Sequence, residues 1–169
     1  ATVATGSIRR RAHLSHLRPD LTFSGLRGNI ETRLSKAEGF DAVVVAAAAL
    51  DRLGLVPDVV DRLDPTILLP QVAQGALAVE CRSGDVDVGE VLEAVEDPLA
   101  RRVVDAERAF LAELGAGCDL PIAAYAVLND NEVELVGAVS SSDGSVLLRE
   151  QRRSVDGEAL GQAVARHLL

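Results

Sequence analysis

The apolar positions of this chain of 169 residues change their spacing along its length, and the changes divide it into three parts. Residues 1–71 alternate short apolar strands with helical patterns, which is typical of an α/β domain with a parallel sheet. Residues 72–97 predict a connector with a strand at 76–81, which has no neighbour to pair with, and a short acidic helix at 85–95. Residues 98–169 predict helices and three antiparallel strands, a small α+β domain.

In the first part, each strand leads through a turn of small residues into a helix. Ser7 is expected to cap the first helix, because its hydroxyl can accept a bond from a free backbone N–H. The inner face of that helix is expected to follow Ile8, Ala12 and either His16 or Leu17. The expected strands are 2–4, 21–25 and 41–46, the last covered on both faces, and the expected helices are 8–18, 30–37, 47–53 and 57–63.

The longest helical pattern begins at Pro98 and leads into a glycine-rich turn. Gly115 and Gly117 end the helix, because glycine adopts backbone angles that other residues resist. The turn presents Cys118 between two packed elements, which suits covalent attachment of a carried group; a small buried cysteine is the alternative. The apolar face of the helix is expected to contain Leu99, Val103, Ala106, Phe110 and Leu114.

Beyond the turn, alternating apolar residues predict a meander of strands and then a closing helix. The strands are expected at 122–128, 133–140 and 145–152, with hairpin turns at 129–131 and 142–144, and the helix at 158–169.

The composition narrows the class of protein. Aromatic residues make up 2% of the chain, so its core is built from Val, Leu, Ile and Ala. No apolar run approaches the roughly 20 residues of a membrane span. Cys81 and Cys118 are too few for a disulfide framework, which favours a reducing, cytoplasmic setting, and Cys81 is expected to be a packed core thiol. The chain begins at Ala1 and lacks methionine, which suggests a fragment or a processed chain.

The net charge of −9 argues against a nucleic-acid or anionic-membrane surface. Its distribution is uneven: residues 1–36 hold seven basic and two acidic groups (+5), and the remainder holds ten basic and twenty-four acidic groups (−14). A basic block in an acidic protein indicates either a local site for a small polyanion or a solvated basic face.

Four arginines of this block lie at two strand-to-helix junctions. Arg9 and Arg10 occupy the first turn of a helix, where a cation is unfavourable unless an anion is bound there. Arg27 and Arg33 flank the next junction. Because such junctions lie along the carboxyl edge of a parallel sheet, the four guanidinium groups are expected to face one crevice and bind carboxylates.

Five motifs, in this order, resemble the porphobilinogen deaminase (hydroxymethylbilane synthase) family over essentially the whole chain. They are Thr5-Gly6-Ser7-Ile8-Arg9-Arg10, Leu26-Arg27-Gly28-Asn29, Thr32-Arg33-Leu34, Gln74-Gly75-Ala76, and Glu107-Arg108 followed by Gly117-Cys118-Asp119-Leu120-Pro121.

The resemblance implies a cytoplasmic, monomeric transferase of tetrapyrrole biosynthesis, whose dipyrromethane cofactor is bound to Cys118 through a thioether. On this primer the family condenses four porphobilinogen units head to tail and releases ammonia. The residues implied to hold the carboxylates of the cofactor, the substrate and the growing polypyrrole are Thr5, Ser7, Arg9, Arg10, Arg27, Arg33 and Gln74.

The chain also departs from the family. The N-terminal domain that carries the catalytic Asp has no counterpart here, so no residue of this chain is expected to be catalytic, and residues 76–95 would return to that missing domain. Ala73 and Ala116 stand where the family has glycine, and Gly6 where a second serine is common.

Two other readings remain open at this stage. The α/β pattern, with its expected doubly wound, periplasmic-binding-protein-like fold, would also serve a non-catalytic carboxylate-binding module. That module would give no reason for the Cys118 loop. A structural or interaction remnant without a ligand is the third hypothesis.

Overall fold

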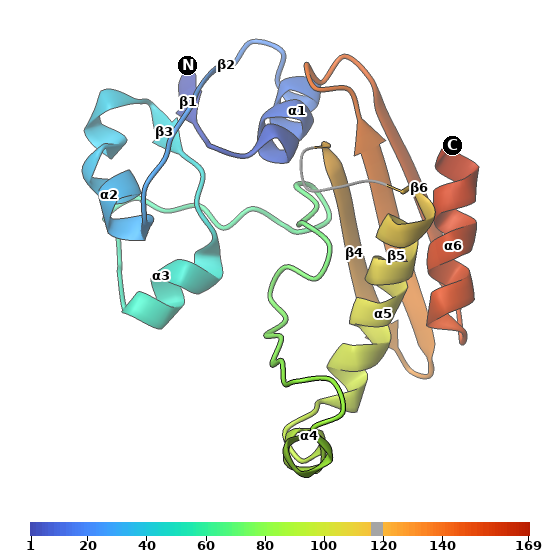
Figure 1. Ribbon diagram of the computed structural model, residues 1–169. Helices are drawn as coiled ribbons and strands as arrows, with labels where there is room; N and C mark the ends of the chain where they lie inside the picture. The colour runs from blue at the N-terminus through green and yellow to red at the C-terminus, as the bar shows by residue number, and fades with distance from the viewer. Residues whose placement is uncertain (116–119) are drawn as a thin grey trace.

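A parallel sheet and an antiparallel sheet form two units joined by a long stretch of irregular chain (Figure 1). The computed structural model describes residues 1–115 and 120–169. The elements are β1 (Thr2–Ala4), α1 (Ile8–Leu17), β2 (Thr22–Ser24), α2 (Ile30–Ser35), the 3-10 helix η1 (Ala37–Gly39), β3 (Ala42–Val43), α3 (Ala47–Leu53), α4 (Val86–Glu93), α5 (Pro98–Glu113), β4 (Ile122–Asn129), β5 (Glu132–Ser140), β6 (Leu147–Ser154) and α6 (Gly157–Leu168).

The first unit is a parallel sheet with β1 at its centre, in the order β2-β1-β3. Val3 of β1 pairs with Phe23 of β2 and with Ala42 of β3. Each of the first two helices is capped as its sequence predicts: the Ser7 side chain accepts from the N–H of Arg10, and Asn29 caps α2 in the same way. The α/β class of this part is therefore confirmed.

The second unit is an antiparallel sheet in the order β4-β5-β6, and α5 and α6 pack on one of its faces (Figure 1). Its core is built mainly from small and branched apolar side chains around the fully buried Phe110. A Cβ on Gly161 of α6 would meet the backbone of α5, so the two helices approach as closely as glycine allows. The expected α+β part is confirmed, with small differences in where its strands begin and end.

The other face of this sheet is covered in part by the first half of the chain. Leu69 is fully buried against Ala123, Val136 and Ala138. The N–H of Ala124 donates to the carbonyl of Pro70 at 3.2 Å, so the connector lies along β4.

The long helix α5 ends where the glycine pattern predicts, and Gly115 has a left-handed φ of 61°. Ala106 and Phe110 are buried and Val103 and Leu114 pack against them, as expected. The prediction for Leu99 is wrong, because this side chain is exposed. Cys118 lies outside the described residues.

Two elements expected in the first unit are shorter or absent. The strand expected at 41–46 is reduced to the two residues of β3, and exposed Ala42 shows that it is not covered on both faces. The helix expected at 57–63 does not form. Val56 and Val59 are 90% and 93% exposed, and a short helix with nothing to pack against is unstable.

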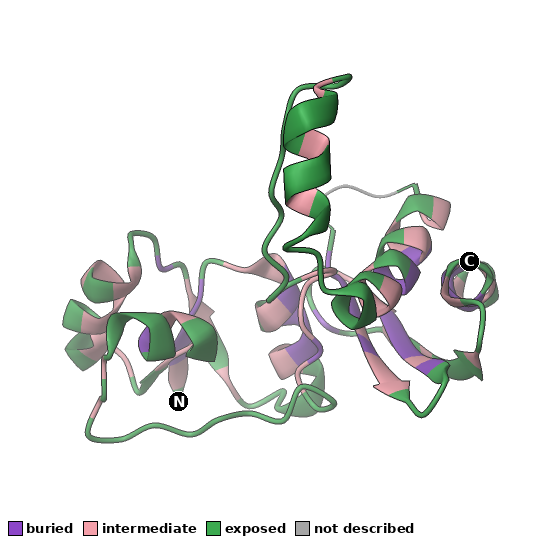
Figure 2. Cartoon of the chain, turned by 90° about the horizontal axis from the view of Figure 1, so that it is seen from below, coloured by how far each residue is buried: buried purple, intermediate pink, exposed green. Residues whose placement is uncertain are grey.

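The expected strand at 76–81 also does not form. Its only pairing in the described part of the chain is an isolated bridge between Gln74 and Ala76. Leu77 and Val79 are exposed, and Cys81 is an exposed thiol, so the prediction of a packed core cysteine is wrong. The following α4 projects from the molecule with much of its surface exposed (Figure 2). No helix among the described residues is both long and apolar enough to cross a membrane.

Candidate functional site

The junction between β1 and α1 is organised by two hydroxyl side chains. Thr5 is buried, and its Oγ1 accepts from the N–H of Ser7 at 3.2 Å. Ser7 Oγ in turn accepts from the N–H of Arg10 at 3.3 Å. The two oxygens thus hold the backbone at the start of α1, and each hydroxyl retains its own hydrogen as a donor.

Arg10 and Arg33 come together at the carboxyl edge of the parallel sheet. Arg10 Nη1 donates at 3.1 Å to the carbonyl of Val44, directly after β3, and Arg33 Nε donates at 2.8 Å to the carbonyl of Gly28. Burial and then the positive charge of Arg33 lower the pKa of Arg10. Two like charges held this close favour an anion between or beside them.

Arg9 lies on a different side of α1 from the expected crevice. It is 4% exposed, its Nη1 donates to the carbonyl of Leu69, and its Nη2 donates to Gln74 Oε1 at 3.3 Å. Burial, followed by the charge of Arg10, lowers the pKa of Arg9 to about 10, so the guanidinium remains charged at neutral pH. The structure therefore pairs Arg9 with Gln74 on the connector.

The remaining members of the expected site are Arg27 and Gln74. Arg27 is exposed, and its guanidinium makes no hydrogen bond or ion pair with any described residue. Gln74 accepts from Arg9 and from the N–H of Gln71 at 3.1 Å. The four arginines are thus split between the sheet edge and the connector.

The electrostatic surroundings of these arginines fit a ligand that carries carboxylates. Within the described part of the chain, none of Arg9, Arg10, Arg27 and Arg33 forms an ion pair, although the chain holds 26 acidic residues. Guanidinium groups bind carboxylates in bidentate fashion, so unpaired arginines provide the donors that such a ligand needs.

Glu107 on α5 belongs to one of the five sequence motifs, but the sequence did not indicate its role. Its side chain is buried: Oε2 accepts from the N–H of Ala73 at 2.6 Å, and Oε1 accepts from the N–H of Ala126 at 2.8 Å. Burial raises the pKa of Glu107, and the two N–H donors oppose that shift. One carboxylate thus ties the connector to β4.

Two of the departures from the family have structural consequences. Ala73 has φ of 57°, a left-handed conformation that costs an alanine about 1–2 kcal/mol and that glycine adopts freely. A Cβ on Gly6 would stand 2.6 Å from the carbonyl oxygen of Leu26, so this backbone leaves no room for a serine. Ala116 lies outside the described residues.

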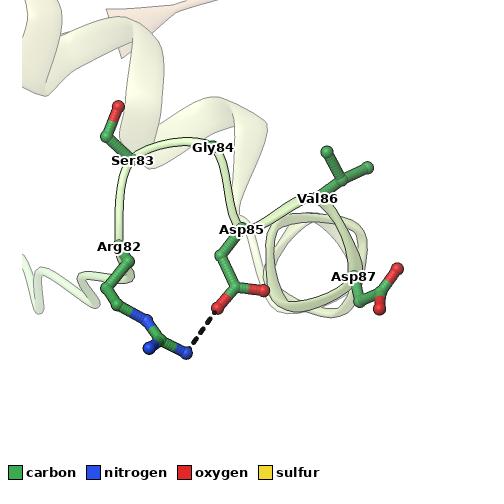
Figure 3. Close-up of a pocket in the computed structure, with 6 residues that line it drawn as sticks. All are labelled: Arg82, Ser83, Gly84, Asp85, Val86 and Asp87. Atoms are coloured by element: carbon green, nitrogen blue, oxygen red, sulfur yellow. Dashed lines mark hydrogen bonds and ion pairs between the residues drawn. The ribbon is translucent and has the colours of Figure 1, made fainter.

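A hollow of about 500 Å³ lies away from the arginines, before α4 (Figure 3). Arg82 and Asp85 form an ion pair at 3.1 Å beside it, and Asp85 caps α4. Its lining contains none of the residues expected in the site. We therefore place the candidate site at the arginines.

Comparison with known proteins covers nearly the whole chain. The family model described as "Porphobilinogen deaminase, dipyromethane cofactor binding domain" matches residues 1–90, and the "Porphobilinogen deaminase, C-terminal domain" matches residues 102–169.

Curated relatives named porphobilinogen deaminase agree with these matches. The protein from Roseiflexus castenholzii is 46% identical over 100% of this chain and 57% of its own length. The protein from Bacillus cereus is 45% identical over 56% of its own length, and the protein from Bacillus pumilus is 44% identical over 55% of its own length. The chain thus spans little more than half the length of the relatives it matches. It belongs to the porphobilinogen deaminase family.

Proposed function

We propose that this chain is the cofactor-bearing part of a hydroxymethylbilane synthase of tetrapyrrole biosynthesis, a transferase that condenses porphobilinogen units with release of ammonia. The observation that carries the proposal is the group of four arginines without acidic partners at the start of a chain with net charge −9. Porphobilinogen and the growing polypyrrole carry carboxylates, and these arginines are the donors suited to hold them.

Within this proposal each side chain has a separate task. Arg10 and Arg33 bind carboxylates at the sheet edge, and Arg27 reaches them from the β2 junction. Ser7 and Thr5 donate hydroxyl hydrogens beside them. Arg9 fixes the position of Gln74 on the connector, and Gln74 orients the ligand from the other side.

Cys118 is proposed to hold the dipyrromethane through a thioether, and the cofactor, when bound, supplies the primer to which pyrroles are added. The donors that suit its carboxylates are the same unpaired arginines. The catalytic Asp belongs, in this proposal, to an N-terminal domain outside the chain, because this chain spans only 57% and 56% of the relatives from Roseiflexus castenholzii and Bacillus cereus.

The domain organisation proposed is 1–71 for the arginine domain, 72–97 for a segment that returns to the N-terminal domain, and 98–169 for the cysteine domain. The sheet order with β1 at the centre supports a doubly wound, periplasmic-binding-protein-like fold for the first of these. The exposed Leu77 and Val79 support the second, because they are apolar residues that the described residues leave uncovered. We further propose a cytoplasmic, monomeric enzyme that binds neither nucleic acid nor membrane.

Intact mass tests the proposal. The chain would be produced with the N-terminal domain of the Roseiflexus relative fused before it, as wild type, Cys118→Ser and Cys81→Ser. We expect wild type and Cys81→Ser to carry the mass of one dipyrromethane and to colour with an acidic aldehyde reagent, and Cys118→Ser to do neither. An unmodified wild type that still binds simple dicarboxylates would favour the carboxylate-binding module instead. An unmodified protein that binds none would favour a remnant without a ligand.

A further inference from the structure

His13 is a buried basic side chain for which the proposed function has no use. It is 1% exposed, on the face of α1 that turns toward the second unit, and its Nε2 has no hydrogen-bond partner among the described residues. The sequence placed His16 or Leu17 on this inner face, and both are exposed instead. Burying a polar nitrogen without a hydrogen-bond partner costs free energy, so His13 bears on how stably α1 packs against the second unit.

That contact joins α1 to the turn between β5 and β6 (Figure 1). Arg11 Nη2 donates to the carbonyl of Ser142 at 3.3 Å, and His16 Nδ1 lies 3.1 Å from the carbonyl oxygen of Gly144. The backbone of Ala12 approaches Gly144 so closely that a Cβ on that glycine would meet the Ala12 carbonyl. The fit is close. His13 lies on the adjoining side of α1, one turn beyond Arg9, and Arg149 of β6 in the second unit is among the charged groups that act on it.

The charged groups that act on His13 are all basic. Arg9 and His16 act on it from α1, and Arg149 from β6. The pKa of His13 is lowered to about 4, mainly by burial and then by the positive charges of Arg9, Arg149 and His16. A proton on His13 would therefore add a positive charge to a buried and already basic contact.

The acidic groups of the adjoining elements are occupied elsewhere. Asp143, in the β5–β6 turn, accepts from Ser141 and Ser145. Glu134 of β5 pairs with Arg153, and Glu150 of β6 pairs with Arg152 and His167.

We propose that His13 is a proton-operated latch between the two units: while neutral it allows α1 to pack against the β5–β6 turn, and when protonated it releases α1 from that turn. The inference uses neither the cofactor nor the substrate, so it stands or falls apart from the proposed function.

The size of the effect follows from the two pKa values. If His13 has its ordinary pKa of 6.5 when released and about 4 when packed, the ratio of released to packed molecules rises roughly 30-fold between pH 7.5 and pH 5. The direction is fixed, because a proton binds more strongly to the released form.

Nuclear magnetic resonance on the 169-residue chain tests the latch. We would titrate the imidazole of His13 from pH 7.5 to 4.5 and follow the amides of Ala12, Ser142 and Gly144, with amides of α6 as reference. Relaxation dispersion at Gly144 would give the released population at pH 7.5 and pH 5. The variants are His13→Leu and His13→Gln, which cannot be protonated there, and the control is His167→Gln at an exposed position.

We expect His13 to titrate well below 6.5, the contact amides to change with it, and the released population to rise about 30-fold in wild type and His167→Gln but not in His13→Leu or His13→Gln. The inference is overturned if His13 titrates near 6.5, if it titrates low while the contact amides stay unchanged, or if the contact opens at the same pH without His13. Should His13→Leu fail to fold, His13→Gln and the wild-type titration decide the matter.

Discussion

Replacing Glu107 with glutamine should weaken the tie between the connector and the second unit without changing the size of the side chain. In the wild type, the two carboxylate oxygens of Glu107 accept from the N–H groups of Ala73 and Ala126. A glutamine offers one oxygen and one NH₂ group, so one of the two N–H groups would face another donor.

The magnitude follows from this mismatch. A buried N–H left without an acceptor costs about 1–3 kcal/mol. Part of that cost is offset, because the substitution also removes a carboxylate whose pKa burial raises. We therefore expect Glu107→Gln to lower the free energy of unfolding by about 1–2 kcal/mol at pH 7.5.

The pH dependence has a definite sign. Because the pKa of Glu107 is raised in the folded state, the folded protein binds this proton more strongly than the unfolded chain. Its contribution to stability is therefore greatest below the unfolded-state pKa and is lost as the pH rises through the folded-state pKa. The difference in stability between wild type and Glu107→Gln should accordingly widen from pH 7.5 to pH 5, while the effect of His13 cancels in the comparison.

Urea unfolding followed by circular dichroism measures these differences. Glu113→Gln is the matched control, because Glu113 lies on the same helix but pairs at 2.7 Å with an Arg166 whose side chain is 62% exposed. We expect the control to cost less than about 1 kcal/mol. If Glu107→Gln cost no more than Glu113→Gln, the buried carboxylate would not be the tie described here.

Three further substitutions, with Gly89→Ala as a control for one of them, test backbone features by the same unfolding assay. Ala73→Gly should stabilise the chain by about 0.5–1 kcal/mol, because it relieves a left-handed alanine at φ of 57°; a loss of stability would contradict this. Gly161→Ala should cost about 1–3 kcal/mol, since its Cβ would stand 2.7 Å from the Phe110 nitrogen, whereas Gly89→Ala in α4, with open space around it, should cost nothing. Gly6→Ala should also be destabilising, by displacement of the Leu26 carbonyl; unchanged melting would show that this loop shifts freely.

The second unit was predicted well because its packing partners lie within its own sequence. The period of α5 placed Ala106 and Phe110 in the core, and alternation predicted the three strands, of which the second contributes Val133 and Leu135 to that core. Both helices and all three strands pack on one another, so local pattern and tertiary structure agree. The prediction that Leu99 is buried was wrong because this residue lies in the first turn of α5, beyond the part of the helix that packs on the sheet.

The first unit and the connector were predicted less well, because several of their apolar segments are exposed and form no regular structure. Residues 57–63 and 76–81 are apolar enough for a helix and a strand, yet Val59 and Leu77 are exposed and pack against no surface in the part of the chain that the structure describes. Regular structure in short segments depends on such packing. The sequence pattern therefore indicates which helix or strand these segments can form, and whether they form it depends on a surface against which they can pack.

The sequence did not predict which charged side chains are buried. Helical periodicity assigns charged side chains to the solvent face, so Arg9, His13 and Glu107 were not expected to be buried. The burial of Arg9 and Glu107 depends on backbone carbonyl and N–H groups from other parts of the chain, such as those of Leu69 and Ala73. Hydrogen bonds between distant segments leave no periodic pattern in the sequence, so the sequence could not predict them.

These buried charges link the arginine domain to the helix that precedes Cys118. Arg9 donates to Gln74, the neighbouring Ala73 donates to Glu107, and Glu107 belongs to α5, which ends at Glu113, ahead of Cys118 in the sequence. A displacement of α1 would therefore strain the connector and reach α5 through two hydrogen bonds, of 3.3 and 2.6 Å. His13 lies one helical turn beyond Arg9, so the proposed latch would act on the same helix that holds Arg9 against the connector.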